Sequence, residues 1–426
     1  MSTGGSGGIG ADGGSASGGA STGGKSAMGG TGSGGTGSGG TGNGGTGNGG
    51  SASGGKGSGG AAAGGKAATG GTGSGGTGTG GATSSACSPS PCLNGGTCRD
   101  QAGTAVCTCS GGFIGTTCAT KAVTWLDGAG CRAAGISGDA SVVVGACIAA
   151  KVSSAVRWNG VTKTTLAPYS GGAQASALGV SKNGLVIVGW SLDSSSERLA
   201  VRWVGGTANN YQHYAQVDSY EDEARRTSSD GAVSVGIASR AGEYASGARW
   251  ATFTGAPTYL AAGKGHDYSY ATGVSADGNT VVGYATDESD GFVWTASGGY
   301  ASLPGLNGSA DNEALGISDD GHVIVGASGG VATRWVDKVP SSLGSIGEGI
   351  AASSDGSVIV GMIGNDPFVW TSAAGIRPLA TVLSGLGVTM SGYTLARVTD
   401  LSDDGHVIVG YGSDGSSDRA FRITLP

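Results

Sequence analysis

Short runs of β-branched residues recur from about residue 140 onward, each directly after a polar turn signal. One example is Val281-Val282-Gly283, which follows Ser275-Ala276-Asp277-Gly278. Ser and Asp oxygens bond nearby backbone N–H groups, and Gly accepts the positive φ that a tight hairpin turn needs. The apolar run predicts a strand buried on both faces, and the apolar residues before the turn predict its antiparallel partner.

This turn-and-strand unit occurs seven times, at steps of 35 to 49 residues. The first copy has Ala140 where the others have Gly, so its turn is expected to be strained or different. A period in this range is typical of repeat architectures, in which neighbouring units supply one another's core. The turn residues that define the seven copies are Asp139, Asn183, Asp230, Asp277, Asp320, Asp355 and Asp404.

A second landmark follows every turn and adds two more strands to each unit. Six copies end it with Trp, as in Ala155-Val156-Arg157-Trp158, and the seventh ends it with Ile423. Glycine-containing turns and weaker apolar stretches follow, which gives four short antiparallel strands per repeat. Seven such repeats favour an all-β fold, a seven-bladed β-propeller of four-stranded repeats over residues 121–426. A β-solenoid or two smaller β domains are the alternatives.

The last repeat stops after its third strand, while residues 122–126 stand alone before the first repeat. We therefore expect Ala122 to Leu126 to complete the last blade and close the ring. The alternative is that Trp125 belongs to a linker packed against the side of the domain.

Composition divides the rest of the chain. The sequence has 426 residues, 93 of them Gly, and a net charge of −7. Residues 1–86 are Gly, Ser, Thr and Ala with little else, which predicts a disordered tether. This tract resembles those of bacterial surface lipoproteins, although no signal peptide is recognisable here. No basic cluster suits nucleic acid or a membrane surface, and no apolar run predicts a transmembrane segment.

Six cysteines lie within residues 87–118, a segment with too few apolar residues for a core of its own. The segment resembles an EGF-like module in Cys92-Leu93-Asn94-Gly95-Gly96-Thr97-Cys98 and in the run from Cys107 to Cys118. The resemblance implies disulfides between Cys87 and Cys98, Cys92 and Cys107, and Cys109 and Cys118. Spacing alone leaves fifteen pairings open.

Cys131 and Cys147 lie outside this segment, on either side of the first turn. A regular hairpin centred on residue 139 places them opposite each other, at a distance that a disulfide can bridge. All eight cysteines then pair, which indicates an oxidising compartment, outside the cell or on its surface.

The repeats also resemble the HAF family of probable extracellular repeats. They keep its element of a small residue, an apolar residue and Ser or Asn, followed by Gly and Val-Val-Gly, as in Gly273 to Gly283. They depart from its His-Ala-Phe element. The resemblance implies export and a repeat β fold, and it carries no catalytic residues.

Catalytic and metal-binding motifs are missing from the sequence, so no cofactor and no metal is expected. His322 and His406 occupy equivalent repeat positions, which indicates repetition rather than a metal pair. Arginines recur at one position of the third strand, for example Arg249 and Arg422, and we expect a structural ion pair there.

Propeller topology places the connections between blades on the face opposite the tight turns, where binding residues commonly lie. Aromatic and acidic residues there suit a sugar or a cationic protein. We therefore expect a non-enzymatic surface protein that binds an extracellular carbohydrate or protein; the alternative is a secreted carbohydrate-active enzyme with two facing carboxylates. The candidate ligand-binding residues are Tyr211, His213, Tyr214, Tyr220, Asp222, Asp267, Tyr268 and Tyr270.

Overall fold

The computed structural model describes residues 85–426, except 170, 206–210, 214–221, 241–242, 253, 261–267 and 287–289. Internal contacts divide the chain into Met1–Thr79 and Gly80–Pro426, and all described residues belong to the second unit. Nearly all of the tether expected over residues 1–86 therefore lies outside the described residues.

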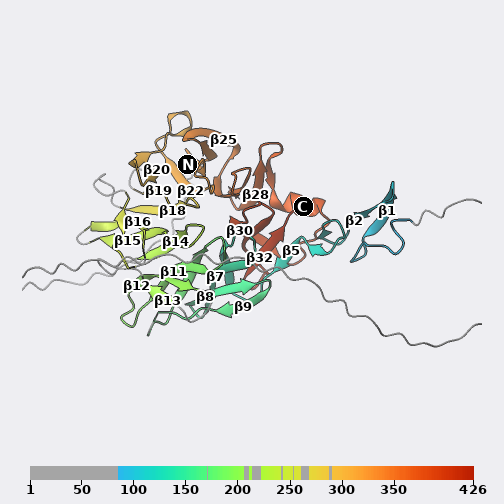
Figure 1. Ribbon diagram of the computed structural model, residues 1–426, viewed down its shortest axis with the longest axis horizontal. Helices are drawn as coiled ribbons and strands as arrows, with labels where there is room; N and C mark the ends of the chain where they lie inside the picture. Colours follow the sequence, from blue (N-terminus) through green and yellow to red (C-terminus); the bar gives the residue numbers. More distant parts are fainter. Residues whose placement is uncertain are drawn as a thin grey trace, which may run out of the picture. The chain divides into compact units, whose positions relative to one another are not determined.

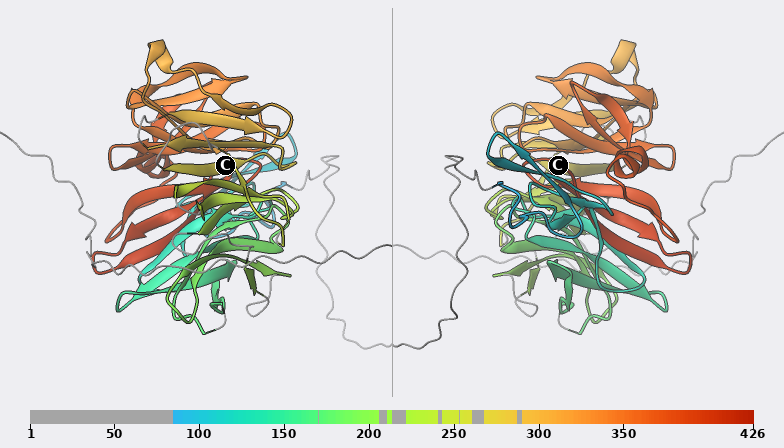
Figure 2. Two further views of the ribbon diagram at one scale, coloured as in Figure 1. Left: turned by 90° about the vertical axis from the view of Figure 1, so that its left-hand side faces the viewer. Right: turned by 90° about the vertical axis from the view of Figure 1, so that its right-hand side faces the viewer.

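Seven four-stranded antiparallel sheets follow one another around a common axis, so the predicted seven-bladed propeller is confirmed (Figure 1). Each sheet runs outward from the strand nearest the axis, and the side views show the sheets fanned one above another (Figure 2). Blade 1 consists of β6 (Cys131–Ile136), β7 (Val142–Ala149), β8 (Val152–Asn159) and β9 (Thr162–Thr165). Blade 2 consists of β10 (Ala175–Val180), β11 (Val186–Leu192), β12 (Arg198–Val204) and β13 (Tyr211–His213). Blade 3 consists of β14 (Glu223–Thr227), β15 (Ser234–Arg240), β16 (Glu243–Trp250) and β17 (Thr258–Tyr259). Blade 4 consists of β18 (Ser269–Val274), β19 (Thr280–Ala285), β20 (Gly291–Thr295) and β21 (Gly299–Ser302). Blade 5 consists of β22 (Asn312–Ile317), β23 (Val323–Ser328), β24 (Val331–Val336) and β25 (Val339–Ile346). Blade 6 consists of β26 (Glu348–Ala352), β27 (Val358–Ile363), β28 (Asp366–Thr371) and β29 (Gly375–Pro378).

Blade 7 is built from both ends of the repeat region. Its inner strands are β30 (Thr394–Leu401), β31 (Val407–Ser413) and β32 (Asp418–Thr424), and its outermost strand is β5 (Val123–Trp125). The register pairs Phe421 with Trp125, and the backbone N–H of Leu126 donates to Ala420 O at 2.9 Å. The predicted ring closure is therefore confirmed.

The turn between the two inner strands has the same hydrogen bonds in every blade. In blade 3 the hydroxyl of the buried Ser228 donates to Asp230 Oδ1 at 2.7 Å and accepts the N–H of Val233 at 3.0 Å. Blade 1 keeps this pattern with Ala140 at φ +58°, so the turn is strained rather than rebuilt. The turn carboxylates therefore serve the fold.

Aromatic residues of the third strands fill the spaces between blades. Trp158, Trp203, Trp250 and Trp335 are fully buried. The indole N–H of Trp158 donates to Asp127 O at 2.8 Å, in the segment that leads into its blade. Equivalent bonds occur in blades 2 and 5. Each such Trp fixes its blade to the preceding connection.

The arginines of the third strand also join blades, through partners that differ from the expected ion pair. Arg422 donates to Ala140 O at 2.8 Å, and Arg249 donates to Gly278 O at 2.9 Å. In both cases the acceptor is the turn carbonyl of the next blade. Arg334 lies over the ring of Trp370, 4.6 Å from its centroid. The role of these arginines is structural, as predicted. The guanidinium groups of the three named here contact backbone carbonyls and an aromatic ring.

The disulfide-rich region contains β1 (Thr97–Gln101), β2 (Thr104–Thr108), β3 (Phe113–Ile114) and β4 (Thr120–Lys121). Its disulfides join Cys87 to Cys98, Cys92 to Cys107 and Cys109 to Cys118, the pairing expected from the sequence resemblance. Ile114 is buried in one apolar cluster with Leu383 of α1 (Leu379–Gly385), a short helix in the connection from blade 6 to blade 7. This region is therefore packed against the propeller. A 3₁₀ turn, η1 (Leu306–Gly308), lies between blades 4 and 5.

A fourth disulfide joins Cys131 to Cys147 across β6 and β7, as predicted. All eight cysteines are thus paired, which favours an extracellular or otherwise oxidising compartment. The described part of the chain holds no helix with the length and apolar character needed to span a membrane.

Candidate ligand site on the propeller axis

The channel along the axis is lined by one bulged residue from each innermost strand. In every blade the pairing of the first two strands shifts at the residue three positions before the turn Ser. A bulge re-aims the side chain of its extra residue, and here it faces the channel. The seven bulged residues are Ala134, Leu178, Arg225, Thr272, Leu315, Ile350 and Thr399.

At the end of the channel near the tight turns, seven backbone hydrogen bonds form a closed belt. The residue between Ser and Asp of each turn donates its N–H to the carbonyl of the equivalent residue in the next blade, at 2.9–3.1 Å. The last bond, from Asp403 to Gly138, returns to the first blade. The belt narrows this end and ties every blade to its neighbour.

Three charged side chains of this belt meet across the narrow end. Lys182 Nζ lies 3.0 Å from Asp319 Oδ1 and also contacts Asp403 Oδ1. Burial lowers the pKa of Lys182, but the two carboxylates outweigh it and raise the pKa above its ordinary value. Lys182 therefore stays charged and bridges blades 2, 5 and 7 across the channel.

Two further charges lie inside the channel, next to a narrow space of about 80 Å³. Arg226 and Asp400 stand two residues before the turn Ser, where four other blades have Gly. Asp400 accepts the N–H of Ile136 at 3.2 Å, and burial raises its pKa although Arg226 and Lys182 oppose the shift. Arg226 donates to Leu178 O at 2.8 Å.

The opposite end of the channel widens into an axial pocket of about 330 Å³ on the face that receives the connections between blades. The bulged residues form its wall, and Arg226, Arg397 and Glu223 complete the lining. Glu223 accepts Arg225 Nε at 2.6 Å, and Arg397 Nη2 lies 2.8 Å from Glu348 Oε1. Arg225 also stacks 4.7 Å from the ring centroid of Tyr270.

The structure separates the predicted binding residues. Tyr270 lies in β18 beside Arg225, at the rim of the axial pocket, with its ring centroid 5.3 Å from that of Tyr284. Tyr268 immediately precedes that strand. Asp222 is 1% exposed and accepts the N–H of Ser239 at 2.7 Å, so its carboxylate takes part in the fold of blade 3.

The remaining predicted residues do not join this group. Tyr211 and His213 belong to β13, the outermost strand of blade 2, and not to a connection as expected. Regular pairing with β12 extends to His213, which moves both residues away from the axis. Tyr214, Tyr220 and Asp267 lie outside the described residues.

Sequence reasoning missed Arg225, Arg226 and Arg397. The signal available was departure from the repeat: Arg226 replaces a Gly common to four copies, and Arg225 stands where the other copies have Ala, Thr, Leu or Ile. That these positions line the axis is not visible before the bulge is known.

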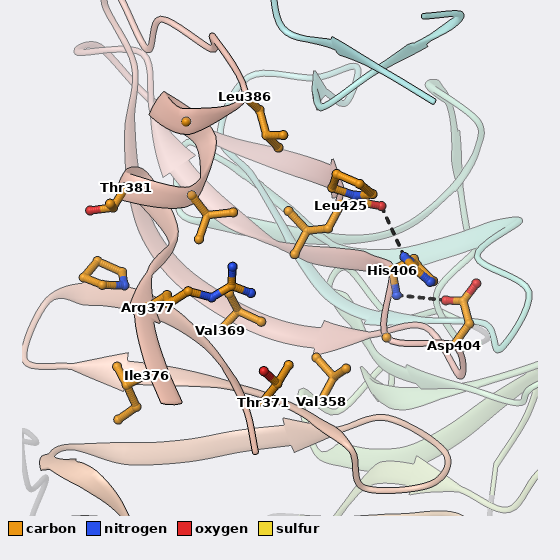
Figure 3. Close-up of a pocket in the computed structure, with 15 residues that line it drawn as sticks. Val358, Val369, Thr371, Ile376, Arg377, Thr381, Leu386, Asp404, His406 and Leu425 are labelled. Carbon is orange, nitrogen blue, oxygen red and sulfur yellow. Dashed lines mark hydrogen bonds between the residues drawn. The ribbon is translucent and has the colours of Figure 1, made fainter. Parts of the chain in front are cut away.

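A larger groove of about 670 Å³ lies outside the axis, between α1 and blades 6 and 7 (Figure 3). Its walls are mainly apolar, from Val358, Ile376 and Leu386. Two of its polar side chains are used by the fold: Asp404 accepts the N–H of His406 at 2.9 Å, and His406 Nδ1 contacts Leu425 O at 3.3 Å. The axial pocket therefore offers the richer set of ligand-facing groups.

Within the ranges that the structure describes, no group of three or more His, Cys, Asp or Glu residues is arranged to hold a metal ion. The two histidines that share a repeat position make different contacts. His322 pairs with Asp337, which raises its pKa, whereas His406 contacts a carbonyl.

No family model matches the chain, and no curated protein matches it. Among solved structures it is similar to the β-propeller domain of Myceliophteria thermophila Cps50 (Swd1), at 9% identity and a TM-score of 0.49, over 71% of this chain and 98% of that one. An oligogalacturonate lyase from Vibrio parahaemolyticus matches at 12% identity and a TM-score of 0.48, over 71% and 93% of the two chains. TolB from Acinetobacter baumannii matches at 15% identity and a TM-score of 0.37, over 49% of this chain and about half of its own length (54%). These likenesses concern the fold alone.

Proposed function

We propose that this protein is an extracellular, non-enzymatic binding protein of the HAF-repeat type, in which a Gly-rich N-terminal tract and an EGF-like module precede the propeller. The observation that carries the proposal is the axial pocket, which is blocked at one end by Lys182, Asp319 and Asp403 and open on the face of the connections. A blind pocket on a rigid ring suits recognition of an extracellular carbohydrate or protein.

The four disulfides support the extracellular setting, and the packing of Ile114 against α1 supports a rigid mount for the ring. Among the described residues that line the pocket, the one carboxylate is Glu223, and it is held by Arg225. A glycosidase of the common type needs two facing carboxyl groups. The lining therefore supports binding over hydrolysis.

The test is retention of the full chain on immobilised extracellular glycans and proteins, compared with an Ala134→Trp variant. Ala134 is a bulged residue of the pocket wall, so the indole is expected to fill the pocket. A ligand retained by the native chain and lost by the variant supports the proposal. Equal retention of both proteins on every ligand contradicts it.

A carbohydrate-active enzyme is the second candidate, and one observation favours it. Burial and the neighbouring Glu348 raise the pKa of Glu313, as a general acid requires. Release of reducing sugar from a glycan panel, abolished by Glu313→Gln, is the outcome that this candidate predicts.

A further inference from the structure

Three guanidinium groups converge on the axial pocket from two blades that are not neighbours. Arg225 and Arg226 come from β14 of blade 3, and Arg397 comes from β30 of blade 7. We propose that the axial pocket recognises the carboxylate of an acidic sugar at the end of a glycan chain, an inference that rests on the proposed binding function.

The charges of the lining favour an anionic ligand. Three arginines and one carboxylate line the pocket among the described residues, so its wall carries an excess of positive charge. Glu348 holds Arg397 from outside the lining, through Nη2 at 2.8 Å. Guanidinium has five N–H donors in a fixed plane, so a single contact of this kind leaves donors for a planar carboxylate.

The donors of the other two arginines are divided in the same way. Arg225 contacts Glu223 through Nε and Nη2 and also hydrogen-bonds Tyr284, and the contacts of Arg226 with Leu178 O and Arg225 O use Nη1. These contacts hold each guanidinium in place. A positioned arginine binds a carboxylate with less loss of side-chain entropy than a free one.

The remaining wall suits a sugar ring better than an isolated carboxylate. Leu178, Leu315 and Ile350 present apolar surface at the level of the arginines, which can cover the C–H face of a pyranose. Thr272 and Thr399 donate their hydroxyls to backbone carbonyls, at 2.7 and 3.1 Å, which leaves their oxygens to accept from sugar hydroxyls. A volume of about 330 Å³ is at the small end of ligand pockets.

The closed far end decides which part of a ligand can enter. The backbone belt and the Lys182 cluster block passage through the ring. A polymer cannot thread through such a pocket, but its terminal unit can enter. This favours a chain-terminal acidic sugar over a run of acidic side chains from a protein.

The experiment measures binding of the full chain by titration calorimetry to four probes: a trisaccharide ending in glucuronate, its methyl ester, a trisaccharide ending in glucose, and a penta-glutamate peptide. We expect the acidic trisaccharide to bind about 10- to 100-fold more tightly than its ester, because charge-assisted hydrogen bonds to arginine are lost. Arg397→Gln is expected to weaken acid binding by about 10-fold, whereas Arg99→Gln, on exposed β1, leaves it unchanged.

The Glu348→Gln variant separates an effect on the ligand from a general loss of stability, because a loss of stability alone would not tighten binding. The glutamine removes a negative charge near the bound acid, while its amide oxygen can still accept from Arg397 and hold it, so acid binding is expected to tighten by about 3-fold while binding of the glucose-ended probe is unchanged. Weaker acid binding in this variant, in a chain that still unfolds cooperatively, contradicts the inference.

The other outcomes are distinguishable. Equal binding of acidic and neutral trisaccharides, both lost in Ala134→Trp, overturns the ligand class and leaves the binding function standing. Tighter binding of the peptide overturns the sugar in favour of a protein partner. Failure of all four probes to bind overturns the inference. The proposed binding function is then tested separately, by retention of the native chain and of Ala134→Trp on the panel of immobilised extracellular glycans and proteins.

Discussion

Trp125 and Phe421 pair across the strands that close the ring, with ring centroids 5.9 Å apart in an edge-to-face contact. Trp125 precedes the first repeat and Phe421 lies in the last strand, so this contact joins the two ends of the repeat region. Trp125 also stacks on Tyr393, with centroids 4.4 Å apart. Closure therefore depends on a short strand held by aromatic packing as well as by hydrogen bonds.

Removal of the closing strand is expected to open the ring. A chain that begins at residue 119 keeps β5 and should unfold in one cooperative transition, whereas one that begins at residue 127 lacks it and leaves β32 with an unpaired edge. Size-exclusion chromatography and urea denaturation compare the two. In the longer chain, Trp125→Ala should lower the free energy of unfolding by about 2–4 kcal/mol. A cooperative, monomeric shorter chain would show that closure is dispensable.

The turn glycines contact the preceding blade, and this makes them sensitive to substitution. A Cβ on Gly231, where φ is +78°, would lie 2.5 Å from Val186 Cβ. Gly231→Ala should therefore cost more than the roughly 1 kcal/mol of a positive φ alone. Gly160→Ala is the matched control, since φ is +59° and nothing lies within 4 Å of its Cβ. Equal losses in urea denaturation would contradict the packing argument.

The turn carboxylates predict destabilisation by acid. Hydrogen bonds from the Ala232 N–H and the Ser228 hydroxyl lower the pKa of Asp230, and the other turn aspartates are shifted the same way. A lowered pKa contributes stability that is present above the ordinary value of about 3.9 and is lost as pH falls through the folded-state value. The urea concentration at the midpoint of unfolding should therefore fall when the pH is lowered below about 4.

Blade 2 supplies the control for this prediction, because Asn183 replaces the carboxylate and keeps its bonds to Ser181 and Leu185. Asp230→Asn should lower stability modestly at pH 7, because a neutral amide oxygen accepts the same bonds more weakly than a carboxylate, and should reduce the loss between pH 7 and pH 3. Asn183→Asp should increase that loss. An unchanged acid response in both variants would assign acid sensitivity to other groups.

Lys182 holds two carboxylates together at the narrow end of the channel. Lys182→Met leaves Asp319 and Asp403 without the cation between them, and the free energy of unfolding should fall by about 1–3 kcal/mol at pH 7. In the native chain the raised pKa of Lys182 means that its contribution persists up to about pH 10.4 and is lost as pH rises through its folded-state value. Urea denaturation of both proteins at pH 7 and above about pH 10.4 checks this, because the difference between them should narrow at the higher pH.

The repeat, the turn chemistry, the closing strand and the Cys131–Cys147 disulfide could all be predicted from the amino-acid sequence. Each of these depends on residues close in sequence or on a period that the chain repeats. Hydrogen bonds of a Ser-x-Asp-Gly turn and the alternation around it are local, so Ser228 and Asp230 could be assigned before any blade was placed.

The axial pocket, in contrast, depends on the closed ring. Arg225 and Arg397 meet because blades 3 and 7 face the same axis, and Lys182 reaches Asp319 and Asp403 because the ring is closed. In each innermost strand the bulge three residues before the turn Ser decides which residue faces the channel, and a shift of one residue would place another there. The aromatic and acidic content of the connections therefore pointed to the face on which the axial pocket opens, but the arginines of the pocket became recognisable only when the ring brought them together.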